Sequence, residues 1–277
     1  YVWDAAEEIL VVLNGNSITA GGSGVSVDGS TITITAAGTY RIRGNLSDGQ
    51  VVVNTADEDI VRLILDGVDI SNSTSAPVYV EKADKVVIVL AENTTNTISD
   101  AATYVYADAE EDEPNAAIFS KSDLTITGEG ILVVNGNYND GIAGKDGLIL
   151  TGGTISVTAV DDGIRGKDYI LVEGGNITVV AQGDGMKSDN AGDAEKGYID
   201  IESGVINVTS GGDSITAETD VMISGGQITL SAGGGSNARI DENTSAKGIK
   251  GLVNVNIDGG GDYPQLEKEW KALLESG

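Results

Sequence analysis

A repeat of 22 residues in the centre of the chain restricts its possible folds more than any other feature. Spacings of 22, 22 and 29 residues separate four segments that begin at Asp140, Asp162, Asp184 and Asp213. Spacings of 22, 29 and 22 residues separate the turn glycines Gly153, Gly175, Gly204 and Gly226. One insertion of seven residues between Lys187 and Tyr198 accounts for both irregular steps.

Each copy of the repeat is expected to contain three short strands. In the copy that starts at Asp162 these lie around Ile164, at Tyr169–Val172 and at Asn176–Ala181, and the last shows the alternation of a strand with one buried face. Two repeat positions are aliphatic in every copy: Ile155, Ile177, Ile206 and Ile228, and Ile142, Ile164, Met186 and Ile215. Because a unit of this size cannot bury its apolar face alone, the repeat predicts a right-handed parallel β-helix with coils of about 22 residues.

The same pattern extends beyond the central copies. Phe119 precedes Ile142 by 23 residues and is expected at its repeat position, and Ile249 is expected at that of Met186. Less regular coils are expected upstream, with strands at Thr31–Thr35, Tyr40–Arg43, Val51–Val53, Val61–Leu65, Val78–Val80 and Val86–Leu90. We predict one domain over residues 1–277, with an N-terminal cap at 1–24, coils at 25–262 and a C-terminal capping helix at 263–277. In that helix, apolar residues have helical spacing at Leu266, Trp270, Leu273 and Leu274.

Three other repetitive or all-β folds fit the sequence less well. A leucine-rich repeat needs a regular leucine frame and a helical side, and neither is visible. The calcium-binding nonapeptide repeat has a period of about nine residues, which does not occur here. A β-sandwich would not keep a 22-residue register through insertions that shift every later copy equally.

The charge and the missing residue types exclude several functions. The chain has 43 acidic and 16 basic residues, a formal net charge of −27, with no histidine and no cysteine. Nucleic acids and anionic lipids would be repelled. Without cysteine or histidine, cysteine-based zinc sites and the Ser-His-Asp and Cys-His mechanisms are impossible. No apolar run is long enough to span a membrane, so we expect no membrane insertion.

The aspartates that start four copies form a ladder. Stacked coils place equivalent carboxylates about 5 Å apart, where they repel one another unless cations lie between them. Ca²⁺ prefers oxygen ligands in flexible geometry, so the ladder predicts calcium, with the strongest site at the Asp161-Asp162 pair. The expected ligands include acids five residues after the ladder and are Asp140, Asp161, Asp162, Asp184, Asp189, Asp213 and Glu218. A further ion is plausible in the loop Asp189–Asp193. The acidic run Asp108–Glu113 is either a solvated loop or another cation or sugar contact.

The few basic residues fall in columns beside the acids. Each either balances a neighbouring aspartate or binds sugar carboxylates and hydroxyls, and the tyrosines either stack on sugar rings or on each other. The candidates for carbohydrate binding are Lys145, Arg165, Lys167, Lys187, Tyr138 and Tyr169. Tyr169 and Tyr198 share a repeat position, which favours neither interpretation.

Three segments resemble a known family: Pro114–Ile126, Val134–Ile142 and Asp161–Tyr169, continued by Asp184–Ser188 and Ser245–Lys250. They resemble the secreted carbohydrate-binding domain-containing β-helix proteins of clostridia and related bacteria, over roughly residues 25–260. The resemblance implies a calcium-containing right-handed β-helix, outside the cell or on its surface, that binds cellulose and acidic sugars such as polygalacturonate. Its architecture is similar to that of family 9 pectate lyases.

Three functions remain open. The favoured one is a non-catalytic, extracellular, Ca²⁺-binding protein that recognises plant cell-wall polysaccharide. The alternative is a Ca²⁺-dependent pectate or polysaccharide lyase acting by β-elimination, for which Lys187 is the candidate base, with Lys167 and Arg165 as further candidates. The third is a structural adhesin whose Ca²⁺ only stiffens the coils. A β-helical polygalacturonase is disfavoured because its Gly-His-Gly element needs histidine. The sequence leaves the oligomeric state open.

Overall fold

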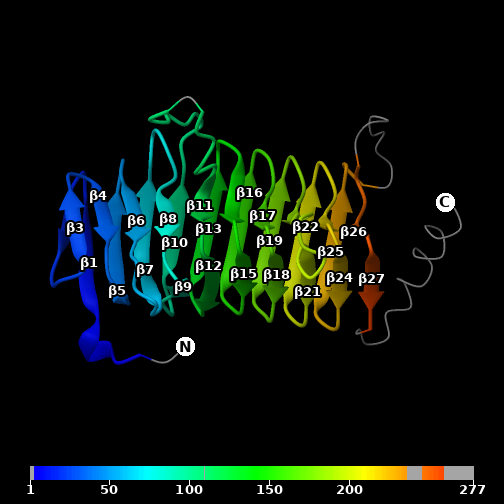
Figure 1. Cartoon of the computed structure of the whole chain (residues 1–277), viewed down its shortest axis with the longest axis horizontal. Helices are drawn as coiled ribbons and strands as arrows, with labels where there is room; N and C mark the ends of the chain where they lie inside the picture. The colour runs from blue at the N-terminus through cyan, green and yellow to red at the C-terminus, as the bar shows by residue number, and fades with distance from the viewer. Residues whose placement is uncertain (1–2, 109, 236–244, 259–277) are drawn as a thin grey trace, which may run out of the picture.

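Alternating apolar residues and turn glycines organise the chain into short strands that stack coil upon coil (Figure 1). The computed structural model describes residues 3–108, 110–235 and 245–258. Successive coils pair in parallel and in register, so the chain forms a parallel β-helix, as the repeat predicts. Among the described residues, no helix is sufficiently long and apolar to cross a membrane.

One face of the β-helix is a ten-stranded sheet, here called sheet B. Its strands in stacking order are β3 (Val25–Asp28), β4 (Thr31–Ile34), β6 (Gln50–Asn54), β8 (Val78–Lys82), β11 (Ala116–Ser120), β14 (Asp140–Gly144), β17 (Ile164–Gly166), β20 (Met186–Ser188), β23 (Ile215–Ala217) and β26 (Ile249–Gly251). Apart from the antiparallel hairpin of β3 and β4, neighbours in this sheet run parallel.

The other two faces belong to one 17-stranded sheet. One stack contains β9 (Lys85–Leu90), β12 (Asp123–Gly128), β15 (Gly147–Leu150), β18 (Tyr169–Val172), β21 (Tyr198–Ile201), β24 (Asp220–Ile223) and β27 (Asn254–Ile257). The second contains β10 (Thr95–Ser99), β13 (Ile131–Gly136), β16 (Thr154–Ala159), β19 (Asn176–Ala181), β22 (Val205–Ser210) and β25 (Gln227–Ala232). The long strand β7 (Val61–Ser71) joins the two stacks because it pairs with both β9 and β10.

The N-terminal residues supply the first rung of that sheet. Strand β1 (Ile9–Gly15) pairs in parallel with β5 (Gly38–Leu46), which pairs with β7, and β2 (Ile18–Ala20) pairs antiparallel with β1. A short 3-10 helix, η1 (Ala5–Glu7), precedes them. All six strands predicted between residues 31 and 90 are present, as β4 to β9. The predicted C-terminal helix lies outside the described residues.

Inward-facing aliphatic rows fill the interior of the coils. Ile142, Ile164, Met186 and Ile215 pair with one another in sheet B, and all are fully buried. Ile155, Ile177 and Ile206 form a second row that is at most 1% exposed, and Ile228 extends it half-buried. Both predicted rows are confirmed. The insertion before Tyr198 is confirmed too, because Tyr198 still pairs with Tyr169 across it.

The expected position of Phe119 is wrong by one residue. Ile118 pairs with Ile142, and Phe119 pairs with Ala143 on the outward face of sheet B. The register pairs show that two of the three turns between β11 and β14 are one residue longer than in the next coil, so Ile118 precedes Ile142 by 24 residues. A shift of one residue exchanges the two faces of a strand, so a period of 23 assigned the wrong side chain to the interior.

Candidate functional site

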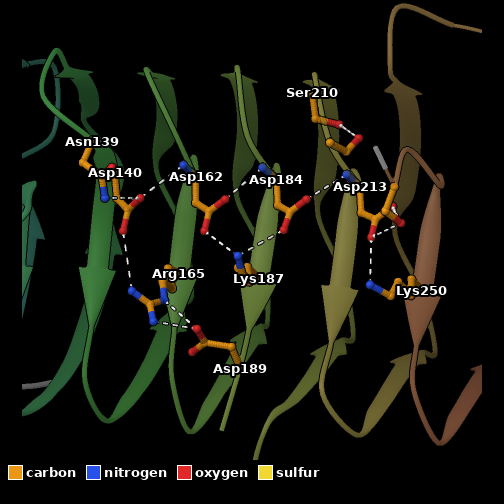
Figure 2. A network of polar contacts seen from close by, with 12 residues as sticks. Asn139, Asp140, Asp162, Arg165, Asp184, Lys187, Asp189, Ser210, Asp213 and Lys250 are labelled. Atoms are coloured by element: carbon orange, nitrogen blue, oxygen red, sulfur yellow. Dashed lines mark hydrogen bonds and ion pairs between the residues drawn. The ribbon is translucent and has the colours of Figure 1, made fainter. Parts of the chain in front are cut away.

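The four ladder aspartates lie one above another at the edge where the sheet B strands begin (Figure 2). In each, Oδ1 accepts a hydrogen bond from the backbone N–H of the next rung. The donor–acceptor distances are 3.1 Å from Asp162 to Asp140, 2.9 Å from Asp184 to Asp162, and 2.8 Å from Asp213 to Asp184. Oδ1 therefore helps to hold adjacent coils in register, and Oδ2 is the atom left to meet a counter-charge.

Lysine side chains supply that counter-charge on the three downstream rungs. Lys187 Nζ lies 3.0 Å from Asp162 Oδ2 and 3.2 Å from Asp184 Oδ2, so one ammonium group bridges two rungs (Figure 2). Lys250 Nζ lies 3.2 Å from Asp213 Oδ2. Both lysines lie in the outward column of sheet B. Lys187 follows Asp184, the ladder residue of its own coil, by three residues. On these rungs, lysine ammonium groups occupy the position where the sequence predicted metal ions.

Asp140, at the upstream end, has no lysine partner and forms a long ion pair with Arg165 instead (Figure 2). Its side chain is 1% exposed, and Oδ2 is buried without a hydrogen bond. Arg165 Nη1 is 3.9 Å away, beyond hydrogen-bonding distance. That guanidinium instead faces Asp189 Oδ2, at 3.0 Å from Nε and 2.6 Å from Nη2. A buried oxygen acceptor without a donor is unfavourable, and it is satisfied by a cation as well as by a hydrogen bond.

The two ends of the ladder differ in electrostatics as well as in contacts. Burial, reinforced by the charge of Asp162, raises the pKa of Asp140 to about 7. Burial also acts to raise the pKa of Asp213, but the N–H of Lys247, the hydroxyl of Ser245 and Lys250 outweigh it and lower that pKa below its ordinary value. Asp140 is therefore the ladder carboxylate whose negative charge is least compensated.

Three neighbours of Asp140 offer further oxygens, and they are Asp161, Asp162 and Asn115. Among the described residues, Asp140, Asp161 and Asp162 form an acidic cluster whose ligand oxygens all lie within 4.8 Å of one another. Asn115 Oδ1 is also buried without a partner, one coil upstream, and the carbonyl of Asn115 accepts a hydrogen bond from Asp140 N at 3.2 Å. The three carboxylates and the unpartnered Asp140 oxygen fit a hard cation that prefers oxygen ligands, such as Ca²⁺, and Asn115 adjoins them through its backbone contact with Asp140.

A missing side chain keeps this cluster open. A Cβ on Gly183 would lie 2.3 Å from Asp161 Oδ1 and 2.9 Å from Asp162 Oδ1. Gly183 occupies the position of Asp161 one coil downstream, and Gly212 occupies it on the next. Glycine there leaves room for both carboxylates and for a ligand between them.

Other predicted site residues lie elsewhere. Lys145, Lys167, Asp189 and Glu218 form a column just after the ends of the sheet B strands, whereas the ladder lies at their beginnings. Lys145 pairs with Glu113, and Asp189 reaches the ladder only through Arg165. In the inserted loop, Asn190 and Lys196 bind Asp168 at 2.5 and 2.7 Å. The structure therefore separates Glu218 and the loop from the acidic cluster.

The two candidate tyrosines stack on other tyrosines. Tyr138 lies against Tyr104, with ring centroids 4.3 Å apart and planes 17° from parallel. Tyr169 stacks on Tyr198 at 5.5 Å and 14°. Tyr169 lies at the start of β18, outside sheet B. This arrangement fits the structural interpretation of the shared repeat position.

Sequence reasoning missed Asn115. Its column continues through Asn139 and Asp161 on the next two coils, one residue before the ladder position. The shared pattern Asn-x-x-Ile at residues 115–118 and 139–142 was the indication that could have revealed it. It was obscured by the longer turns of that coil.

Comparisons with known proteins agree with the fold and bear on the site. The sequence model of a family described as carbohydrate-binding domain-containing protein matches residues 28–265. A protein of Acetivibrio thermocellus with that description is 43% identical over 136 residues, which are 49% of this chain and 48% of that protein. A solved structure described as a polysaccharide lyase-like protein from C. thermocellum, in a gadolinium derivative, is 34% identical. It has a TM-score of 0.81 and covers 90% of this chain and 96% of its own.

Proposed function

The chain belongs to the family of carbohydrate-binding domain-containing proteins, and from this premise we propose that it is a calcium-dependent, non-catalytic binding protein for plant cell-wall polysaccharide. The likeness to a polysaccharide lyase-like protein supports a carbohydrate-binding role for the β-helix. The chain spans about half the length of the Acetivibrio relative, so its glycan, its ion and its location are proposals. We place it outside the cell or on the cell surface, where such polymers occur.

The observation that carries the calcium proposal is the buried, unpartnered Oδ2 of Asp140. Asp140, Asp161, Asp162 and Asn115 would hold the ion. Ca²⁺ takes six to eight oxygens, more than these side chains provide, and Asp161 is exposed to solvent. The remaining positions can therefore accept water or the carboxylate and hydroxyl oxygens of a sugar. When bound, the ion supplies the positive charge that a uronate needs on this acidic surface.

The binding of acidic sugars should depend on this ion more than the binding of neutral sugars does. A net charge of −27 repels a polyuronate over a long range. Arg165 and Lys187 offer little compensation, because Asp189 holds the first and Asp162 with Asp184 holds the second. Neutral cellulose meets no such repulsion. Chelation should thus abolish polygalacturonate binding while leaving most cellulose binding.

The lyase alternative rests on the structural likeness and requires a neutral base. Lys187 is the candidate, but its ammonium group bridges two carboxylates. Although burial acts in the opposite direction, Asp162 and Asp184 raise the pKa of Lys187 above its usual range. A protonated, doubly paired lysine cannot accept the proton next to a uronate carboxylate. This arrangement supports binding without cleavage.

A binding assay with and without Ca²⁺ tests the proposal. We would measure retention on insoluble cellulose and on immobilised polygalacturonate, in Ca²⁺ and in a chelator. Asp161→Asn should lose the Ca²⁺-dependent retention, and Asp28→Asn, which removes an exposed acid on β3, should not. If neither polymer is retained at any Ca²⁺ concentration, the adhesin interpretation is favoured. Steady release of unsaturated sugar from polygalacturonate, abolished by Lys187→Ala, would establish the lyase instead.

A further inference from the structure

A second concave site lies beside the acidic run, and its lining extends to Pro114, next in the chain to Asn115. The connection between β10 and β11 projects beyond the neighbouring turns (Figure 1). Beneath it an open pocket of about 510 Å³ is lined by Tyr79 of β8, by Lys121, and by residues of the connection that include Val105, Tyr106 and Glu113. Val105 is 70% exposed, the highest value among the exposed large hydrophobic residues. Acidic and other polar groups make up most of the lining, and Tyr79, Tyr106 and the exposed Val105 add aromatic and apolar surface to it.

The wall of the pocket is held in place by tyrosines. Tyr104 is buried and donates a hydrogen bond to Asp100 Oδ2 at 2.8 Å, and its ring stacks on Tyr138. Tyr106 Oη donates to the carbonyl of Pro114 at 2.8 Å. Tyr104 Oη also hydrogen-bonds to the carbonyl of Ala116 on β11 at 3.0 Å, so these contacts hold the connection to the β-helix and to itself. A wall fixed in advance loses little conformational entropy when a ligand binds.

The polar groups of the pocket indicate which ligand it fits. Five acids line it, Glu81, Glu110, Glu111, Asp112 and Glu113, against Lys121. Lys121 Nζ is 3.7 Å from Glu113 and 5.8 Å from the ring of Tyr79, so this cation is already engaged. A surplus of carboxylates repels a uronate but accepts hydrogen bonds from sugar hydroxyls. Each tyrosine ring is partly covered, Tyr79 by Phe119 at 6.0 Å and Tyr106 by Tyr104 at 6.1 Å between centroids, and the remaining ring surface suits the C–H face of a sugar ring.

We propose that this pocket is a subsite for a neutral sugar ring, independent of Ca²⁺; the proposal rests on the carbohydrate-binding function proposed above. Between the two sites, the outward column of sheet B runs from Tyr79 past the buried Phe119 and Ala143 to Arg165 and Lys187. One polysaccharide chain lying along this face reaches both. The face then has a neutral-sugar end at Tyr79 and a cation-dependent end at Asp140.

Titration with cellohexaose and with oligogalacturonate, in Ca²⁺ and in a chelator, tests the subsite. Tyr79→Ala should weaken cellohexaose binding at least tenfold under both conditions, whereas Tyr79→Phe, which keeps the ring, should largely retain it. Val105→Asp should also weaken it, and Val180→Asp, at a valine that is 47% exposed on β19, is the matched control. Oligogalacturonate binding in Ca²⁺ should be unchanged in Tyr79→Ala and Val105→Asp.

Each outcome decides a separate claim. If the wild type binds cellohexaose and both pocket variants bind it equally well, the subsite is wrong and the proposed function stands. If the wild type binds only oligogalacturonate, the subsite is again refuted. If the wild type binds neither sugar, the proposed function fails and the subsite fails with it. Because Val105 is so exposed, its substitution keeps the test valid even if Tyr79→Ala does not fold.

Discussion

Replacing Asp140 by asparagine should stabilise the calcium-free protein at neutral and alkaline pH. The ordinary pKa of an aspartate is 3.8, and burial with the Asp162 charge raises that of Asp140 to about 7. The folded state therefore prefers the protonated acid. Below the unfolded pKa the two states are protonated alike; as the pH rises towards 7 the folded protein loses stability, and above 7 the loss is constant.

The pKa shift sets the size of the effect. About three pH units at about 1.4 kcal/mol each give a loss of about 4 kcal/mol, in which the attraction of Arg165 at 3.9 Å is already included. Asparagine keeps the Oδ1 acceptor for the N–H of Asp162 but carries no charge. In a chelator, the free energy of unfolding of Asp140→Asn should exceed that of the wild type by a margin that grows between about pH 4 and pH 7.

Calcium should narrow this difference. Ca²⁺ at a hundred times its dissociation constant stabilises the folded wild type by about 2.7 kcal/mol, and the asparagine variant should gain far less. Denaturant unfolding at about pH 4, 6 and 8, in chelator and in Ca²⁺, measures both effects. Asp28→Asn controls for the change in net charge. A stability difference independent of pH, or an equal Ca²⁺ gain in the variant, would refute the reasoning.

Three further predictions follow from the contacts along the coils. Gly183→Ala places a Cβ 2.3 Å from Asp161 Oδ1 and should weaken Ca²⁺ binding, measured by calorimetry, whereas Gly21→Ala, where the Cβ meets nothing within 4 Å, should not. Lys187→Met leaves two carboxylates unpaired and should destabilise the Ca²⁺-free protein by about 2–3 kcal/mol in denaturant unfolding, with Lys187→Arg retaining most stability. Ile164→Ala opens a cavity in a fully buried row and should destabilise by about 2–5 kcal/mol, with a lowered midpoint of unfolding.

The repeat revealed the fold because the central coils use the same register. Ile142, Ile164 and Met186 share one face whatever the turns between them contain, so a period of 22 was sufficient to identify the inward rows. The prediction for Phe119 was wrong because its coil does not have this period. Two turns, each lengthened by one residue, move the period of that coil to 24, and a register wrong by one residue assigns side chains to the opposite face of the strand.

The site was predictable by position but not by pairing. Alignment of the copies placed Asp140, Asp161 and Asp162 together, and the structure keeps them within 4.8 Å. The state of Lys187 could not be read from spacing, because a long side chain can bridge two rungs or extend into solvent. Only the distances of 3.0 and 3.2 Å show that it bridges them. The unpartnered oxygens of Asp140 and Asn115 likewise depend on where neighbouring donors point.

Asp140 and Asp189 compete for Arg165, and this competition distinguishes Asp140 from the other ladder aspartates. Lys187 and Lys250 each pair with the aspartate one coil upstream, and the equivalent partner of Asp140 is Arg165. Asp189 draws that guanidinium away and so leaves Asp140 for an ion. Asp189→Ala should therefore release Arg165 towards Asp140 and lower the Ca²⁺ affinity about tenfold, or about 1.4 kcal/mol, although Asp189 itself need not touch the ion.

The matched control is Glu218→Ala, which removes an acid from the same column one coil further along. The substitution changes the net charge equally, but Glu218 is not the ion-pair partner of Arg165. The Ca²⁺ affinity should therefore stay near that of the wild type. Calorimetric titration with Ca²⁺ compares the three proteins. Equal affinities in both variants would mean that Arg165 does not compete for Asp140. A larger loss in Glu218→Ala would indicate that total charge, rather than this local competition, governs binding. The double variant Asp189→Ala with Arg165→Ala should regain the affinity, because the competing cation is then absent.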